Sequence, residues 1–222
     1  MSRRGAHMGR GVRRRMARPE VDGSRLRWPG AAQRFALFGE VLWVGALMAI
    51  VCVPVITWPA AVAAGAAHLR RYLSAEATPP SEFFRDALRA MPGALAVGAA
   101  TTALAAVIGL DLALLAGGGL PGGMPVAVIV AAIGVVALVL AVIAASLWSP
   151  GTPWRALVQI SPRVARADLS GTAYTVAALG LAATIVWQFL PLVIPVLGLL
   201  AFALVAVGER RMLRLEAAAQ AR

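Results

Sequence analysis

The sequence predicts an all-α protein: a polytopic helical membrane bundle with about six crossings and both termini in the cytoplasm. Three observations support this fold class. Of the 222 residues, 60% are hydrophobic and 14% are charged, whereas soluble domains average about 25% charged residues. The apolar residues gather into four long blocks, and prolines interrupt the first and the last. Arginines lie between the blocks in a pattern that indicates the topology.

Residues 1–34 form an arginine-rich arm. Ten of the 21 basic residues lie here, all are Arg, and Gly and Pro are interspersed without helical periodicity. We expect a disordered cytoplasmic arm close to anionic lipid headgroups. The apolar stretch that follows exceeds the 7–15 residues of a signal-peptide core, so an uncleaved anchor is expected. A translation start at Met8 or Met16 is also compatible with the sequence.

The net charge of +11 raises the question of nucleic-acid binding. Arginine concentrates beside apolar spans, as the positive-inside rule predicts, and no soluble domain adjoins the arm to contact bases. We therefore expect the lipid bilayer, and no nucleic acid, as a partner. The use of Arg without Lys, with abundant Gly and Ala, is typical of a GC-rich bacterial genome. The expected location is the bacterial cytoplasmic membrane.

The four apolar blocks are residues 35–67, 92–115, 124–147 and 174–207. Each middle block has 24 residues, enough to cross a core of about 30 Å once. The outer blocks have 33 and 34 residues, or about 50 Å as helix, which is enough for two short crossings. Pro54 and Pro59 interrupt the first, and Pro191 and Pro195 the last. Each outer block is thus either a kinked helix or a tight hairpin.

The positions of the arginines favour hairpins. The segment between the second and third blocks, residues 116–125, carries no charge, and the segments after the other three blocks carry arginines. Four crossings would place the seven loop arginines outside the cell, whereas six crossings place every arginine-bearing segment in the cytoplasm. A re-entrant segment would satisfy the same charges. The seven loop arginines are Arg70, Arg71, Arg85, Arg89, Arg155, Arg163 and Arg166. The arginines after the last block are Arg210, Arg211, Arg214 and Arg222.

Two connecting segments are patterned. Residues 81–91 place apolar side chains on one helical face and charges on the other, which predicts an in-plane interfacial helix. Thr152-Pro153-Trp154 predicts a helix start with an N1 proline and an aromatic side chain at the interface. Residues 117–119 are glycines and predict a flexible turn. The organisation is therefore an arm (1–34), a membrane domain (35–209) and a short basic cytoplasmic tail (210–222).

Four motifs lie in order between residues 35 and 100: Glu40-Val41-Leu42-Trp43, the segment 53–61 with Pro54, Thr57 and Pro59, then 68–72 with Arg70 and Arg71, and finally 83–89 with Phe83, Phe84 and Arg85. Together they resemble the YesL-like family of bacterial integral membrane proteins of unknown function. Glu40 stands where that family usually has Asn, and Trp58 where Gly often precedes the second proline. The resemblance implies an accessory role in carbohydrate uptake, with carbohydrate ABC-transporter components as partners.

Charged residues at membrane depth are candidates for function because their placement there is unfavourable. Glu40 and Asp111 qualify, although both lie near block ends, where an interfacial placement also accounts for them. Thr57, between two prolines, is expected to bond backbone groups freed by the break, with substrate contact as the alternative. His68 is expected to be an interfacial polar residue. The motif residues complete the candidates: Trp43, Pro54, Pro59, Arg70, Arg71, Phe83, Phe84 and Arg85.

The sequence carries none of the hydrolase, metalloprotease, phosphate-loop or redox motifs that would predict catalysis. We expect no enzymatic activity, no metal site and no cofactor. Two functions compete. One is an accessory subunit that docks a partner through the helix at 83–89. The other is a small transporter with a site at the proline-broken helices. Gly and Ala are dense in every block, which permits close packing within the chain or in a homo-oligomer.

Overall fold

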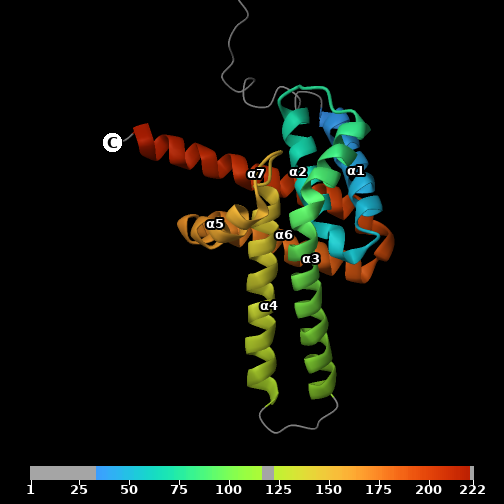
Figure 1. The fold of residues 1–222 in the computed structure, drawn as a ribbon, viewed down its shortest axis with the longest axis vertical. Coiled ribbons are helices and arrows are strands. Elements are labelled where there is room, and N and C mark those ends of the chain that lie inside the picture. Colours follow the sequence, from blue (N-terminus) through green and yellow to red (C-terminus); the bar gives the residue numbers. More distant parts are fainter. Residues whose placement is uncertain (1–33, 117–122, 221–222) are drawn as a thin grey trace, which may run out of the picture.

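The computed structural model describes residues 34–116 and 123–220, which are helical apart from short turns (Figure 1). The arm before Arg34 and the predicted glycine turn at 117–119 lie outside the described residues. Among the described residues, four helices, α3, α4, α6 and α7, are long and apolar enough to cross a membrane. This confirms the apolar helical class, but four is fewer than about six, the number of crossings that the sequence predicts. The elements are α1 (Arg34–Val51), η2 (Val55–Thr57), α2 (Trp58–Leu73), α3 (Pro80–Ala116), α4 (Gly123–Ser146), α5 (Trp154–Ala167), α6 (Leu169–Gln188), η3 (Leu190–Leu192) and α7 (Val193–Gln220).

Both long apolar blocks are broken at their prolines. In the first, α1 ends at Val51, Pro54 adopts an extended conformation, and α2 begins four residues later. In the last, α6 ends at Gln188, and Phe189 is extended before the η3 turn. Proline is tolerated at the first turn of a helix, where the missing N–H has no partner to lose. Each block is therefore two helices that pack against each other, and neither is one kinked helix.

α2 lies at the centre of the fold, packed against α1, α3, α4 and α7. From Pro59 to Leu69 every residue of this helix is buried, and most are Ala. Small side chains allow neighbouring helices to approach closely, which supplies the packing that drives helix association in lipid. The large fully buried side chains around it include Met48, Phe83 and Trp148.

Close contacts at glycines position α1 and α7. A Cβ atom added to Gly45 would overlap the backbone carbonyl of Ile194, and one added to Gly198 would overlap that of Val41. A larger residue at either position would separate the two helices. A third contact of this kind, between Gly98 and the carbonyl of Ile56, holds η2 against α3. The turn that ends the first break is thus packed tightly inside the protein.

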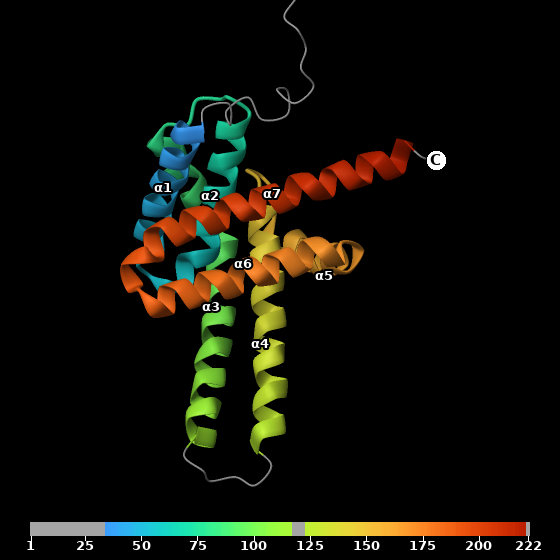
Figure 2. The ribbon, with the colours of Figure 1, turned by 180° about the vertical axis from the view of Figure 1, so that it is seen from behind.

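The helices form two hairpins that run in different directions. α3 and α4 lie side by side and project well beyond the other helices, whereas α6 and α7 run across them (Figures 1 and 2). Apolar side chains on the projecting part are exposed, among them Leu110, Leu114, Ile129 and Val136. Exposed apolar surface of this extent is expected where lipid or another protein covers it.

Two predictions for the connecting segments are wrong. Residues 81–91 form the first turns of α3, which passes through Pro92 without ending, so they are no separate in-plane helix. Trp154 begins α5 with Pro153 as its N-cap, and its ring is buried against Gly93. It is therefore a packing residue within the protein, and its proline is the N-cap and not N1. The predicted tail from residue 210 is helical as well, because α7 continues to Gln220.

Candidate functional site at the arginine-bearing end

Charged side chains from α1, α2, α3, α7 and the α5–α6 junction gather at one end of the protein, which we call the arginine end. It comprises the last turns of α2, α4 and α7, the first turns of α3, and the α5–α6 junction. α1 adds Glu40, and its partner is His68 on α2. The last turns of α2 and α4 and the first turns of α3 lie at the end opposite the tip of the α3–α4 hairpin, whereas α5 lies beside α4 and the last turns of α7 extend to one side (Figure 1).

Glu40 and His68 form a buried pair. Nε2 of His68 lies 2.6 Å from Oε1 of Glu40, with the imidazole fully buried and the carboxylate 19% exposed. The hydroxyl of Thr78 donates to the same carboxylate oxygen at 3.5 Å. The ring of Phe83 packs edge-on against the imidazole. His68 is therefore a buried, hydrogen-bonded residue and not a lone polar side chain.

Arg70 caps α4 from the neighbouring helix. Its Nη1 donates to the carbonyl oxygen of Ser146 at 2.7 Å, and its Nη2 donates to that of Trp148 at 2.6 Å. The last carbonyls of a helix have no partner within the helix and carry partial negative charge, so a guanidinium there is favourable. The cap ties α2 to α4 at the arginine end.

Arg71 joins α2 to α3. Its Nη1 lies 2.7 Å from Oδ2 of Asp86, whose side chain is 4% exposed, and its Nε lies 3.8 Å from Glu82. The more exposed Arg85 and Arg89 pair with Glu82 and Asp86 one turn away. A buried carboxylate needs such a partner, because an unpaired charge is strongly unfavourable in a low-dielectric interior. This pair places the charged face of α3 against α2.

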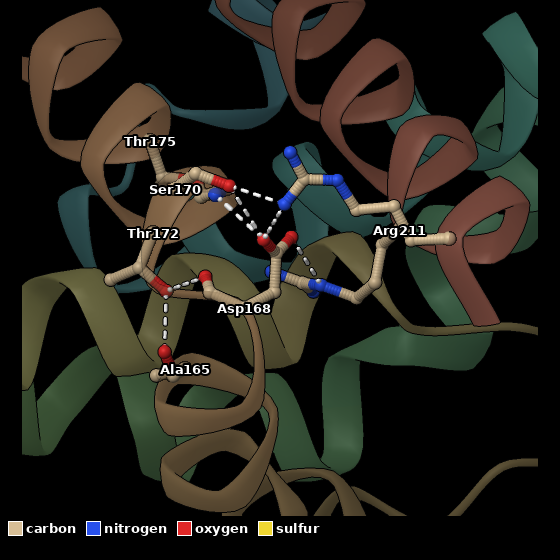
Figure 3. Close-up of polar contacts among 8 residues, drawn as sticks. Ala165, Asp168, Ser170, Thr172, Thr175 and Arg211 are labelled. Carbon is tan, nitrogen blue, oxygen red and sulfur yellow. Dashed lines mark hydrogen bonds and ion pairs between the residues drawn. The ribbon is translucent and has the colours of Figure 1, made fainter. Parts of the chain in front are cut away.

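Asp168 links the start of α6 to α7 (Figure 3). As the N-cap of α6, its carboxylate accepts hydrogen bonds from the N–H of Gly171 at 3.0 Å and the hydroxyl of Ser170 at 2.9 Å. Nε of Arg211 donates to it at 3.3 Å, and Nη1 of Arg214 at 3.2 Å. Burial alone would raise the pKa of Asp168, but these hydrogen bonds and the charge of Arg211 hold that pKa below its ordinary value.

The candidates at the first break have structural contacts. The hydroxyl of Thr57 donates to the carbonyls of Val51 and Pro54, which is the backbone role expected for it. Pro59 is buried near Gly98. Nε1 of Trp58 donates to the hydroxyl of Thr101 at 3.1 Å and so fastens the break to α3.

The remaining candidates lie apart from one another. Trp43 is 47% exposed on α1, and Asp111, far along α3, makes no hydrogen bond or ion pair with a described residue. Phe83 is fully buried, whereas Phe84 is 37% exposed. The docking helix predicted at 83–89 therefore lacks half of its aromatic pair at the surface.

Sequence reasoning missed Asp86, Asp168, Arg211 and Arg214 as candidate residues. For Asp168 a signal was available, because an aspartate directly before an apolar helix is a typical N-cap. The partners of the other three depend on the tertiary fold. Within the part of the chain that the structure describes, no group of three or more His, Cys, Asp or Glu side chains could share a metal ion.

Comparisons with known proteins add no further identification. No family model matches the chain, and neither a curated protein nor a solved structure is similar to it.

Proposed function

We propose that this protein is a non-enzymatic subunit of the bacterial cytoplasmic membrane, with six crossings and both termini in the cytoplasm. Two observations support the topology. Each long apolar block is a pair of helices joined at a proline break, so each has the form of a hairpin. The arginines at the end of α2, in early α3 and in late α7 lie together at one end, as expected for a cytoplasmic face.

Cysteine accessibility tests this topology. In a Cys52→Ser background, single cysteines replace Ser74, Gln159 and Leu213 at the arginine end, and Val53, Gly118 and Phe189 at the breaks and the uncharged segment. The described replacement sites are exposed. The site at Phe189 is needed because α6 and α7 run across α3 and α4. Six crossings require that the first three positions label only from the cytoplasmic side and the last three only from outside. Labelling of Ser74→Cys and Leu213→Cys from opposite sides would contradict this topology.

We propose that the activity is accessory, with the α3–α4 hairpin as the surface that contacts a partner within the membrane. The observation that carries this proposal is the projection of the hairpin beyond the other helices with its apolar side chains exposed. A groove of about 420 Å³ runs between the two helices, lined by small and apolar residues such as Leu104, Ile108, Gly109 and Gly134. Small residues let a partner helix approach closely in lipid. The family resemblance suggests carbohydrate ABC-transporter membrane subunits as that partner.

Two matched glycine variants test the accessory role. A Cβ atom added at Gly109 on α3 or at Gly180 on α6 meets no atom within 4 Å, so both positions open onto free space. Gly109→Leu fills the groove and should abolish co-purification of the transporter subunits from native membranes. Gly180→Leu should leave their recovery unchanged. Equal recovery with both variants would show that the hairpin is not the contact surface.

A second candidate function is a small transporter that exchanges a proton at Glu40 and His68. The fully buried imidazole beside a carboxyl supports it, because buried ionisable pairs in membrane proteins often form proton pathways. Reconstituted vesicles with a pH gradient test it by following flux of sugars and ions. Flux above that of empty vesicles that is lost in Glu40→Gln would support the transporter, and flux equal to that of empty vesicles would exclude it for the solutes assayed.

A further inference from the structure

Helix α5 carries a stripe of exposed arginines. Arg155, Gln159 and Arg163 follow one another at intervals of four residues, and Arg166 follows three residues later. Side chains at these intervals lie on one face of a helix. The opposite face, which begins with Trp154, is buried against the neighbouring helices. These four exposed residues, which we call the α5 stripe, therefore point away from the protein.

The arginines of the α5 stripe have no partner in the part of the chain that the structure describes. None of the three guanidinium groups forms a hydrogen bond, an ion pair or a ring contact with a described residue. Every other arginine whose side chain is described contacts a carbonyl oxygen, a carboxylate or an aromatic ring. Those arginines are Arg70, Arg71, Arg85, Arg89, Arg210, Arg211 and Arg214.

The surrounding sequence offers no carboxylate to neutralise this charge. Residues 112–167 include neither Asp nor Glu. The next acidic residue, Asp168, binds Arg211 and Arg214 of α7. The α5 stripe is therefore a concentration of positive charge that the protein leaves for a partner outside the chain.

The connections of α5 place it beside a membrane surface. The helices before and after it, α4 and α6, are both long and apolar enough to cross a membrane. A segment between two spans begins and ends at a face of the bilayer. Asp168 alone separates the end of α5 from the start of α6. A helix joined this closely to the next span stays near the headgroups.

Apolar side chains beside the stripe also suit the headgroup region. Val158 is 47% exposed and Ile160 is 45% exposed, one on each side of the stripe, and Leu169 is 72% exposed at the start of α6. Arginine at such a site lays its apolar stem along apolar surface and extends its charge to the polar headgroups. A face that met only water would gain nothing from these exposed apolar neighbours.

We propose that the α5 stripe binds anionic phospholipid headgroups at the bilayer surface. Guanidinium groups suit phosphate because their planar donors match its oxygens, and these hydrogen bonds are charge-assisted. Each arginine near an anionic membrane surface strengthens binding about fivefold. This surface is separate from the α3–α4 hairpin, so the proposal does not depend on the accessory role.

A fluorescent probe in the middle of the stripe tests the proposal. In the full chain with Cys52→Ser, Gln159→Cys carries a bimane label, and the protein is held in neutral detergent micelles. Phosphatidylglycerol with a nitroxide near the top of its acyl chain is titrated in, and it quenches the probe when it binds beside it. Phosphatidylcholine with the same nitroxide measures quenching by a lipid without net charge.

We expect half-maximal quenching at a much lower concentration of phosphatidylglycerol than of phosphatidylcholine. Arg155→Gln/Arg163→Gln removes two arginines without partners, so it should raise the required concentration of phosphatidylglycerol about twenty-five-fold. Arg85→Gln/Arg89→Gln is the matched control, because it removes the same charge from exposed arginines that are paired with carboxylates. The control should match the labelled protein without further substitutions.

Two results would overturn the proposal. In one, the two lipids quench the probe at the same concentration, which would leave the stripe open to water or to an acidic protein. In the other, Arg85→Gln/Arg89→Gln weakens quenching as much as Arg155→Gln/Arg163→Gln, which would mean that overall charge attracts the lipid. Micelles have no sides and Gly109→Leu leaves the stripe intact, so neither result depends on the proposed topology or on the accessory role.

Discussion

Glu40 and His68 lie 28 positions apart in the chain and meet at 2.6 Å between α1 and α2, with the imidazole shut off completely from solvent. The pair joins two helices that a proline break separates. Because each side chain satisfies the other in a buried setting, their contributions to stability cannot be independent.

A double-mutant cycle measures this dependence. Glu40→Leu leaves the imidazole without its partner, and His68→Leu leaves the carboxylate without its own, so each single change destabilises the protein. The double variant should be more stable than the sum of the two changes predicts, with a coupling energy of about 1–3 kcal/mol. Unfolding in mixed micelles provides the measurement. Glu76→Leu, which changes an exposed carboxylate, should show no coupling to His68→Leu.

Substitution of Gly45 tests the α1–α7 contact. Gly45→Ala places a methyl group against the carbonyl of Ile194, so we expect the free energy of unfolding to fall by about 1–3 kcal/mol. Gly39→Ala is the control on the same helix, because an added Cβ there meets nothing within 4 Å. Replacing glycine by alanine in an open helical position should leave stability unchanged or slightly raised. Equal losses in both variants would contradict a close contact of α1 with α7.

The lowered pKa of Asp168 predicts that the stability of the protein depends on pH. Its pKa is below the ordinary value in the folded protein, so its ionised form stabilises the fold. That stabilisation is complete above the unfolded pKa of about 4 and is lost as the pH falls through the folded pKa. Asp168→Asn should therefore lower the melting temperature by several degrees at pH 7, and the difference from wild type should shrink towards pH 3. Asp111→Asn, which alters an aspartate without a described partner, should match wild type at both values.

Thr57 is expected to act through its hydroxyl at the first break. Thr57→Val keeps the shape and removes the donor to the carbonyls of Val51 and Pro54, which should cost about 1–2 kcal/mol in unfolding free energy. Thr184→Val is the comparison, because that hydroxyl bonds to its own helix in an exposed position. A loss with Thr184→Val as large as that with Thr57→Val would mean that the break needs no such bond.

The helical class and both breaks could be predicted from the sequence because their causes are local. Long apolar runs require helices in lipid, and proline removes a backbone hydrogen bond in a helix interior. The same reasoning was wrong at Pro92, where α3 continues. There the turns before the proline are held against α2 by the ion pair of Arg71 with Asp86, which is a tertiary contact that overrides a local preference.

The polar pairs could not be predicted because they join distant segments. The contact between Glu40 and His68 spans 28 positions, and that between Asp168 and Arg211 spans 43. Hydropathy and charge counts show that a charged residue lies in or beside an apolar segment. They do not show which other residue it contacts. The crossing of the two hairpins has the same origin, because the glycine contacts of α1 with α7 depend on shape and leave no periodic signal.

The cap that Arg70 forms on α4 joins residues 76 and 78 positions apart. During synthesis, at roughly 5–20 residues per second, α2 leaves the ribosome about 4–15 s before the carbonyls that will receive this guanidinium. For that interval the cation has no protein acceptor and stays hydrated at the membrane surface. The cap that ties α2 to α4 can therefore form only after α4 has been synthesised.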